Sequence, residues 1–227
     1  MLLDCGSGVV ANLAQVVDPT ALDAVFITHN HPDHYADLYV LHAALRYAPD
    51  GPKPPLPLYL PAGLWERIPL LLSERGAADI AEAFIPITLV ASESITIGGL
   101  TVTPHPVQHT DPTFALVAVA DGATLTYTAD TAPCGGVEQA AQGADLLLAE
   151  ATLEEAYEGL APHMTAKQAG ALAREAGVRA LALVHVWPTN DRERMARDAT
   201  AEFGATVIVA SEFDEFDIET DPTGRDD

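Results

Sequence analysis

The segment from Thr28 to His34 most constrains the fold, because it places three histidines and an aspartate within six residues. It follows a short apolar run, Ala24–Thr28, that predicts a buried strand. In an extended segment, side chains two positions apart point the same way, so His29 and His31 can bind one cation. Asp33 and His34 stand where a helix is predicted to begin. They therefore point in another direction and can bind a second cation. These nitrogen and oxygen ligands suit zinc or manganese.

Three more residues of metal-ligand type stand at or just beyond the ends of predicted apolar strands. They are His109, Asp130 and His185. In α/β proteins, ligands gather at the carboxyl edge of the sheet, where the loops converge. His109 or His185 alone would more often be an ordinary core or loop histidine. Together with the histidine-rich segment, they predict one site with seven candidate ligands.

Alternation of apolar runs and helical periodicity predicts an α/β protein whose sheets are covered by helices. The predicted strands are Ala24–Thr28, Leu56–Leu60, Ser94–Gln108, Phe114–Ala120, Thr124–Thr128, Asp145–Ala149, Leu181–Val184 and Thr206–Ala210, with a last edge strand at Glu212–Glu219. The predicted helices are Val9–Val17, Asp33–Tyr47, Gly63–Ser73, Val137–Gln142, Thr165–Ala176 and Asp191–Phe203. Thr165 is expected to cap its helix and Gly177 to end it. Asp121-Gly122 predicts a hairpin turn. We expect a single domain over residues 1–220 and a frayed acidic tail at 221–227.

The charge balance argues against an extended nucleic-acid surface. The chain has 33 acidic and 11 basic residues, a formal net charge of −22, and no basic face was found. No apolar run approaches the roughly 18 residues that cross a bilayer, so no membrane segment is expected. The 2 cysteines form no framework or CxxC pair, which favours a reduced, cytoplasmic protein.

The order His-x-His-x-Asp-His, then His, Asp and His resembles the metallo-β-lactamase superfamily over essentially the whole chain. Its ribonuclease Z-like branch is the most similar. The matching segments are Leu3–Gly8, Tyr127–Thr131, Glu150–Thr152, His163–Ala166 and Leu183–His185. The resemblance implies an αββα sandwich. Family members place one or two strands before the segment that matches Leu2–Gly8, so we expect this chain to lack its first N-terminal strands and to leave a sheet edge unpaired.

The resemblance also implies a site with two divalent metal ions, zinc first and manganese as the alternative. His29, His31 and His109 would hold one ion, while Asp33, His34 and His185 would hold the other, with Asp130 bridging both. A hydroxide between the ions would be the nucleophile, and Asp33 would orient it. His163 resembles the family histidine that lies outside the metal ligands and assists the leaving oxygen. Glu150 is expected to orient a metal-binding histidine or to have a structural role.

Substrate class follows from the interval between His109 and Asp130, which spans only 21 positions. Members that process transfer RNA carry a long inserted arm there, and here a hairpin alone fits. Tight tRNA binding is therefore not expected, and the preferred function is a phosphodiesterase acting on a small substrate. The alternatives are a ribonuclease Z-type tRNA 3′-processing endonuclease, a hydrolase of carboxyl esters, lactones or thioesters, and a non-catalytic metal-binding protein. The sequence does not determine the natural substrate, the metal that is bound in the cell, or whether the protein forms a homodimer.

Overall fold

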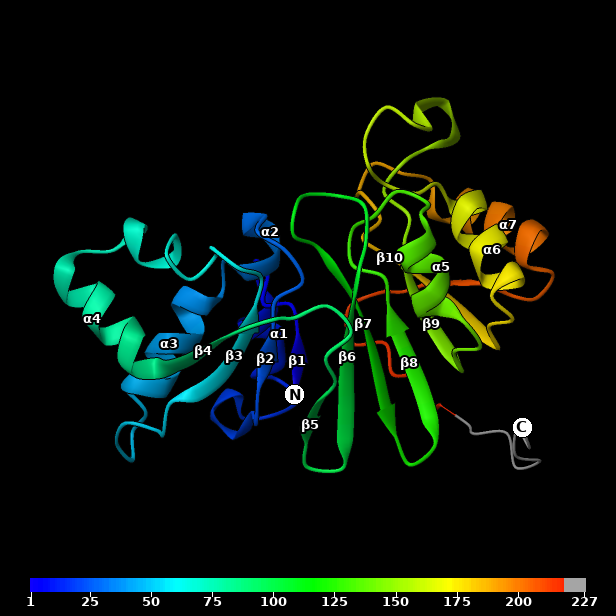
Figure 1. Cartoon of the computed structure of the whole chain (residues 1–227). Helices are drawn as coiled ribbons and strands as arrows, with labels where there is room; N and C mark the ends of the chain where they lie inside the picture. The colour runs from blue at the N-terminus through cyan, green and yellow to red at the C-terminus, as the bar shows by residue number, and fades with distance from the viewer. Residues whose placement is uncertain (219–227) are drawn as a thin grey trace. The chain divides into compact units, whose positions relative to one another are not determined.

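The computed structural model describes residues 1–218, which divide into two compact units, Met1–Val90 and a second unit that begins at Ala91. Each unit is built around its own sheet with helices packed on it (Figure 1). The expected α/β architecture is therefore confirmed. The single domain over residues 1–220 stays a prediction, and the tail at 221–227 lies outside the described residues.

The first unit has a sheet of four parallel strands in the order β1-β2-β3-β4. These strands are β1 (Leu2–Leu3), β2 (Val25–Phe26), β3 (Leu56–Leu60) and β4 (Phe84–Thr88), connected through α1 (Val9–Leu13), η1 (Pro19–Ala21), α2 (Pro32–Tyr35), α3 (Leu38–Arg46), η2 (Ile68–Leu71) and α4 (Glu74–Ala83). Apolar side chains from the strands and from α3 and α4 form the core, including Leu41, Leu58 and Ile80. Parallel strands place all their carboxyl ends at one edge, where Asp4 and His29 follow β1 and β2.

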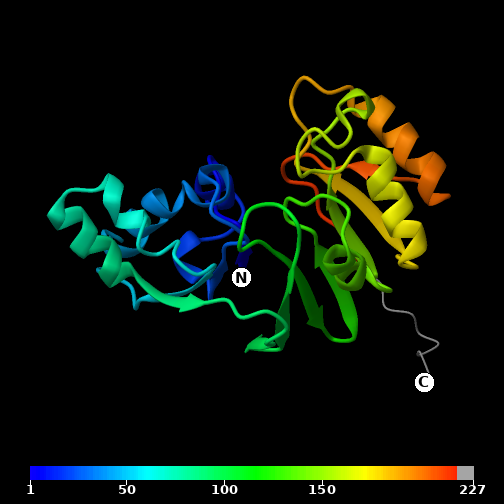
Figure 2. The ribbon, with the colours of Figure 1, turned by 45° about the horizontal axis from the view of Figure 1, so that its top comes forward.

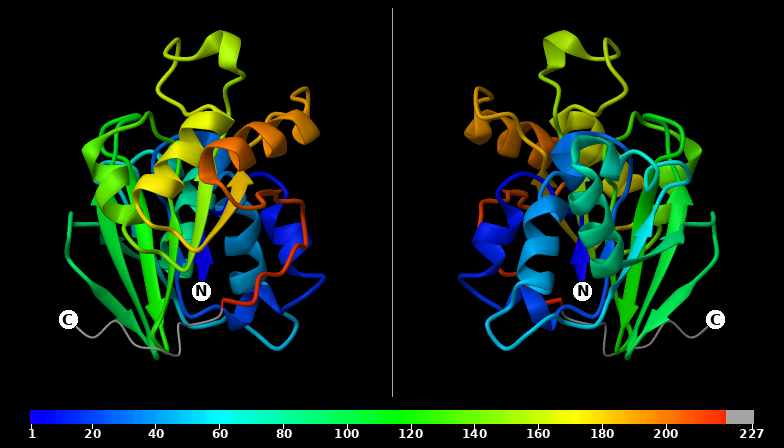
Figure 3. Two further views of the ribbon diagram at one scale, coloured as in Figure 1. Left: turned by 90° about the vertical axis from the view of Figure 1, so that its right-hand side faces the viewer. Right: turned by 90° about the vertical axis from the view of Figure 1, so that its left-hand side faces the viewer.

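The second unit has a mixed sheet of seven strands in the order β11-β10-β9-β8-β7-β6-β5. The strands are β5 (Ile95–Ile97), β6 (Leu100–Pro106), β7 (Phe114–Ala120), β8 (Ala123–Tyr127), β9 (Leu146–Glu150), β10 (Ala180–Val184) and β11 (Ile208–Val209), and the helices are α5 (Gly135–Ala141), η3 (Glu155–Tyr157), α6 (Ala166–Glu175) and α7 (Arg192–Phe203). Helices α6 and α7 lie side by side, and α6 packs against β9 and β10 (Figures 2 and 3). Strand β7 is antiparallel to both β6 and β8, so β6 runs in the same direction as β8, β9 and β10. All four therefore end at the same edge of the sheet.

Several predicted strands are confirmed, and others are wrong. Leu56–Leu60 and Phe114–Ala120 match their strands in full, and Asp121 and Gly122 both have positive φ, at 51° and 81°, as a type I′ hairpin turn requires. Ser94–Gln108 is not one strand, because the chain turns at Gly98-Gly99 between β5 and β6. Strand β4 was not predicted; it contains Pro86 and lies at the edge of its sheet, where proline is tolerated. The edge strand predicted at Glu212–Glu219 is absent from residues 212–218.

Two predicted helices in the first unit are also wrong. Asp33–Tyr47 is broken into α2 and α3, because the Asp37 amide donates to the Cys5 carbonyl (2.9 Å) and the Asp37 carboxylate accepts from the Val10 amide (2.9 Å). Gly63–Ser73 holds only turns and η2. Ser73, expected to end that helix, instead caps α4, since its hydroxyl accepts from the Gly76 amide.

The other helices lie close to their predicted positions. Thr165 caps α6 through a capping box with Gln168, and Gly177, with φ of 65°, follows its end, so both expectations are confirmed. The helix predicted at Val137–Gln142 begins two residues earlier, and the one predicted at Val9–Val17 stops at Leu13. Within residues 1–218, no helix is both long enough and apolar enough to cross a membrane.

Candidate metal centre

The first unit contributes four of the predicted ligands, which we call the N-terminal ligand cluster: His29, His31, Asp33 and His34. His31 is the extended residue before α2, and Pro32 begins the helix, so the chain turns sharply between the two ligand pairs. The ring centroids of His29 and His31 are 4.8 Å apart, and those of His29 and His34 are 4.1 Å apart. His29 and His34 are buried, whereas Asp33 is exposed. The strand-to-helix turn therefore brings the three imidazoles close together.

Asp4 supports this cluster, and it was not predicted as a site residue. Its buried carboxylate accepts hydrogen bonds from the Thr28 amide (2.8 Å), the Thr28 hydroxyl (2.9 Å) and His34 Nδ1 (2.7 Å). The one proton of the Thr28 hydroxyl goes to Asp4, so the hydroxyl oxygen accepts from His29 Nδ1 at 3.0 Å. Both neutral rings therefore carry their proton on Nδ1 and present the Nε2 lone pair. Asp4 has a φ of 58°, a strained backbone that could not be inferred from its sequence neighbours.

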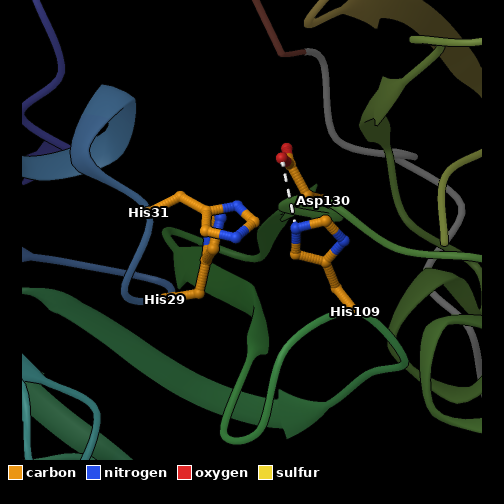
Figure 4. A group of neighbouring side chains, drawn as sticks. All are labelled: His29, His31, His109 and Asp130. Atoms are coloured by element: carbon orange, nitrogen blue, oxygen red, sulfur yellow. Dashed lines mark ion pairs between the residues drawn. The ribbon is translucent and has the colours of Figure 1, made fainter. Parts of the chain in front are cut away.

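The second unit contributes the C-terminal ligand cluster. It contains three predicted ligands, His109, Asp130 and His185, together with His163, which is not one of the predicted ligands. Asp130 and His185 follow β8 and β10, and His109 follows β6, so three of the four stand at one edge of the sheet. His109 Nε2 is 3.8 Å from Asp130 Oδ2, the two atoms joined by the dashed line in Figure 4, and His185 Nδ1 is 3.5 Å from Asp130 Oδ1. Ligand atoms of Asp130, His163 and His185 lie within 4.8 Å of one another. Asp130 is 2% exposed, so its charge is shielded from bulk water.

The Nδ1 atoms of the histidines in this cluster also take part in hydrogen bonds. His109 Nδ1 donates to the Pro162 carbonyl at 3.0 Å, which can only accept. The Thr152 hydroxyl lies 2.7 Å from His185 Nδ1 and 3.2 Å from the His185 carbonyl oxygen, so it fixes the orientation of this ring. His109, whose Nδ1 carries the proton, presents its Nε2 lone pair. Imidazole Nε2 atoms beside carboxylates form a donor set that fits a divalent ion such as zinc.

Glu150, at the end of β9, was expected to orient a metal-binding histidine or to have a structural role. The histidine that it contacts is His163. The fully buried carboxylate of Glu150 lies 2.8 Å from His163 Nδ1 and accepts from the backbone amides of Thr131 (2.8 Å) and Thr152 (3.0 Å). These bonds satisfy the buried carboxylate oxygens and fix the orientation of the imidazole. The His163 ring centroid lies 4.7 Å from that of His109 and 5.9 Å from that of His185. His163 therefore stands within the C-terminal ligand cluster, with its ring held from behind.

Cys5 is excluded as a ligand or nucleophile, although it lies next to Asp4. Its side chain is fully buried, and burial, followed by the nearby charges of Asp37 and Asp4, raises the pKa of the thiol to about 12. A thiol that stays protonated is a poor metal ligand. The predicted ligand set, which contains no cysteine, needs no revision on this account.

Comparison with known proteins agrees with this chemistry. A model of the beta-lactamase superfamily domain matches residues 1–186. The uncharacterized protein Rv1339 of Mycobacterium tuberculosis is 34% identical over 211 residues, which cover 91% of this chain and 77% of that protein. The probable metallo-hydrolase YhfI of Bacillus subtilis is 30% identical over 214 residues, covering 92% and 84% of the two chains. A ribonuclease Z of Mycobacterium bovis is 28% identical over 247 residues, covering 96% and 87%.

The solved structure of YhfI supports the same assignment. It superposes with a TM-score of 0.81 at 28% identity, over 93% of this chain and 84% of that one. The match therefore extends over both units. The chain therefore belongs to the metallo-β-lactamase superfamily, in its ribonuclease Z-like branch, and is a metal-dependent hydrolase of that fold.

Proposed function

We propose that this hydrolase is a phosphodiesterase that acts on small substrates with two divalent ions. The observation that carries the proposal is the His163–Glu150 pair, because it places a proton donor among predicted metal ligands. Hydrolysis of a phosphodiester needs a nucleophile, charge neutralisation at phosphorus and, for a poor leaving group, a proton. When bound, divalent ions would lower the pKa of water and neutralise the charge on the phosphoryl oxygens.

We assign the ligands as the sequence predicts. His29, His31 and His109 would hold one ion, Asp33, His34 and His185 the other, and Asp130 both, with zinc preferred over manganese. Support comes from the Nδ1 hydrogen bonds of His29, His34 and His109, which leave Nε2 as the coordinating atom. Such bonds orient metal-binding histidines in many proteins. Asp33 has an exposed carboxylate, suited to orienting the attacking water as well as to coordination.

His163 would protonate the departing oxygen from Nε2. The hydrogen bond between its Nδ1 and the fully buried Glu150 carboxylate orients the ring and leaves Nε2 as the atom that can give up a proton. An ester whose leaving group departs without a proton has less need of this pair. The arrangement therefore favours substrates with an alkoxide-type leaving group, such as the ribose oxygen of a nucleotide diester.

A small substrate is favoured over transfer RNA by the segment between His109 and Asp130. Strands β7 and β8 fill it, and they are joined by the tight turn at Asp121-Gly122. The ribonuclease Z relative keeps tRNA 3′ processing as the second candidate function. A carboxyl ester, lactone or thioester hydrolase would use the same ligands and remains the third.

A substrate screen of the purified, metal-loaded protein tests the proposal. We expect turnover of bis-p-nitrophenyl phosphate and of dinucleoside monophosphates, abolished by a chelator and restored by zinc or manganese. Lactone, thioester and precursor-tRNA substrates should react at least about tenfold more slowly. Faster turnover of a lactone or thioester than of every phosphodiester would refute it.

Elemental analysis of the same preparation tests the two-ion assignment. Seven ligands should hold close to two equivalents of metal, and His31→Ala and Asp130→Ala should lose both metal and activity. Full activity with no more than one equivalent bound would refute the dinuclear assignment.

A further inference from the structure

A cavity of about 380 Å³ opens beside His163, within the second unit. Its walls come from Gln108, Pro133, the segment 159–162, and Gln168. This segment belongs to the loop between β9 and α6, which stands out beyond the strand ends (yellow-green in Figure 3). A volume of this size can hold a ligand of nucleoside size.

The hollow continues along the helices. A second pocket of about 200 Å³ shares Pro133 and Gln168 with the first and extends between α5 and α6 over Val137, Met164 and Leu172. The Gln168 side chain between them is fixed, since its Oε1 accepts from the Thr165 amide (2.9 Å) and its Nε2 donates to Glu158 (3.1 Å). The two pockets therefore share one fixed amide, and their linings combine apolar side chains with polar groups.

Charge sets the chemistry of this surface. None of the residues that line the two pockets is a lysine or arginine, while Glu138 and Glu175 line the second pocket. Glu158 adds a third carboxylate through its bond to Gln168, and the nearby Lys167 is paired with Glu155 at 3.5 Å. Sites that bind phosphate supply cationic side chains or clustered backbone amides. The cavity beside His163 offers a second phosphate no lysine or arginine, and a phosphate that reached the second pocket would meet the carboxylates of Glu138 and Glu175.

We propose that this cavity receives the leaving group of the substrate and selects one that carries no charge, such as a nucleoside without a further phosphate. The inference rests on the proposed function, because it takes His163 as the donor to the departing oxygen: the cavity that His163 lines is then on the leaving-group side. The enzyme would cleave diesters with one phosphate and discriminate against oligonucleotide ends and nucleoside polyphosphates, with selection exerted at the leaving group.

Two isomeric substrates test this selection. A dinucleoside monophosphate is compared with its two derivatives that carry one terminal phosphate, on the departing or on the retained nucleoside, with the departing half identified by chromatography of the products. The derivatives have the same net charge, so repulsion by the whole acidic protein acts on both. We expect the phosphate on the departing nucleoside to lower kcat/KM by about tenfold relative to its isomer.

A charge variant with a matched control localises the effect. Leu160 is 76% exposed and lines the cavity, so Leu160→Lys adds a cation there without breaking a core contact. Leu160→Lys should reduce the ratio of the kcat/KM values of the two isomers at least about threefold at low salt, and less at high salt. Val119→Lys adds the same charge beside the β7–β8 turn, at the opposite ends of the strands from Asp130, and should leave the difference unchanged. Thermal melts confirm that both variants are folded.

The outcomes separate the two proposals. Equal kcat/KM for the two isomers, or faster cleavage of the one with the charged leaving group, would overturn the inference. The proposed phosphodiesterase activity would not be affected by that result. A difference between the isomers that Val119→Lys reduces as much as Leu160→Lys would also overturn it. Failure to cleave any phosphodiester, including bis-p-nitrophenyl phosphate, would overturn the proposed function and this inference together.

Discussion

Asp4 fixes the ring orientation of two histidines in the N-terminal ligand cluster, one directly and one through Thr28. In Asp4→Asn, the oxygen that accepts from the Thr28 hydroxyl and His34 Nδ1 would become an amide nitrogen, which cannot accept. Removal of such a supporting group typically costs about 10–100-fold in metal affinity. We expect zinc affinity, measured by competition with a chromogenic chelator, to fall within that range.

An aspartate of the same unit supplies the control for this measurement. Asp18 caps the short helix η1 and is exposed, so Asp18→Asn removes a similar charge from the surface. Its zinc affinity should match that of the unaltered protein. Unchanged affinity in Asp4→Asn would show that the histidines keep their orientation without the carboxylate.

His163 is tested by varying the leaving group. General acid catalysis is typically worth about 10²–10⁴-fold, and it matters most when the departing oxygen is strongly basic. His163→Ala should lower turnover of a dinucleoside monophosphate within that range, but it should spare bis-p-nitrophenyl phosphate to within about tenfold. It should also retain both metals. His105→Ala, which alters a histidine of β6, serves as the control and should affect neither substrate.

Two other results would reassign His163. Equal losses on the two substrates, with metal retained, would mean that the ring positions substrate and donates no proton. Loss of metal would mean that it is a ligand, which the 4.8 Å grouping with Asp130 and His185 makes a direct alternative.

At the scale of elements, α6 and α7 pack closely because Gly170 has no side chain. A Cβ added at Gly170 would lie 2.5 Å from the Ala199 carbonyl oxygen and 3.0 Å from the Glu202 Cβ. Gly170→Ala should therefore destabilise the protein by about 1–3 kcal/mol through overpacking, less up to about 1 kcal/mol for the better helix propensity of alanine. We expect Tm in a thermal melt to fall by a few degrees, about 2–4 °C per kcal/mol.

The β5–β6 turn offers a control for this substitution. An added Cβ at Gly99 meets no atom within 4 Å, and Gly99 does not have positive φ, so Gly99→Ala should leave Tm nearly unchanged. Equal Tm for both variants would show that α7 moves away from α6 at little cost.

At the scale of the whole molecule, charge predicts which partners are repelled. With a net charge of −22 and a tight turn where tRNA-processing members carry an arm, the protein should not bind precursor tRNA tightly at physiological salt. A mobility-shift titration should give no complex at sub-micromolar concentrations. Sub-micromolar affinity would restore the tRNA-processing alternative. The dependence of that affinity on salt concentration would then give the number of phosphate contacts.

The sequence by itself determined the family and the alternation of strands and helices, and it predicted the metal ligands. This was possible because the ligands are local signals: His29, His31, Asp33 and His34 stand in one turn, and His109, Asp130 and His185 each follow an apolar strand. Thr165 and Gly177 likewise act within one helical turn, so the ends of α6 could be read directly.

Only the tertiary structure decided the features that depend on distant residues. The break between α2 and α3 depends on Asp37 bonding to Cys5 and Val10, and β4 depends on an edge position that tolerates Pro86. Asp4 and Glu150 act on histidines 30 and 13 positions away. Hydrogen bonds and packing between segments override local propensity, since burying an unpaired polar group costs more than a helix or strand preference can supply. The cavity beside His163 is likewise a property of converging loops, and no run of residues in the sequence encodes it alone.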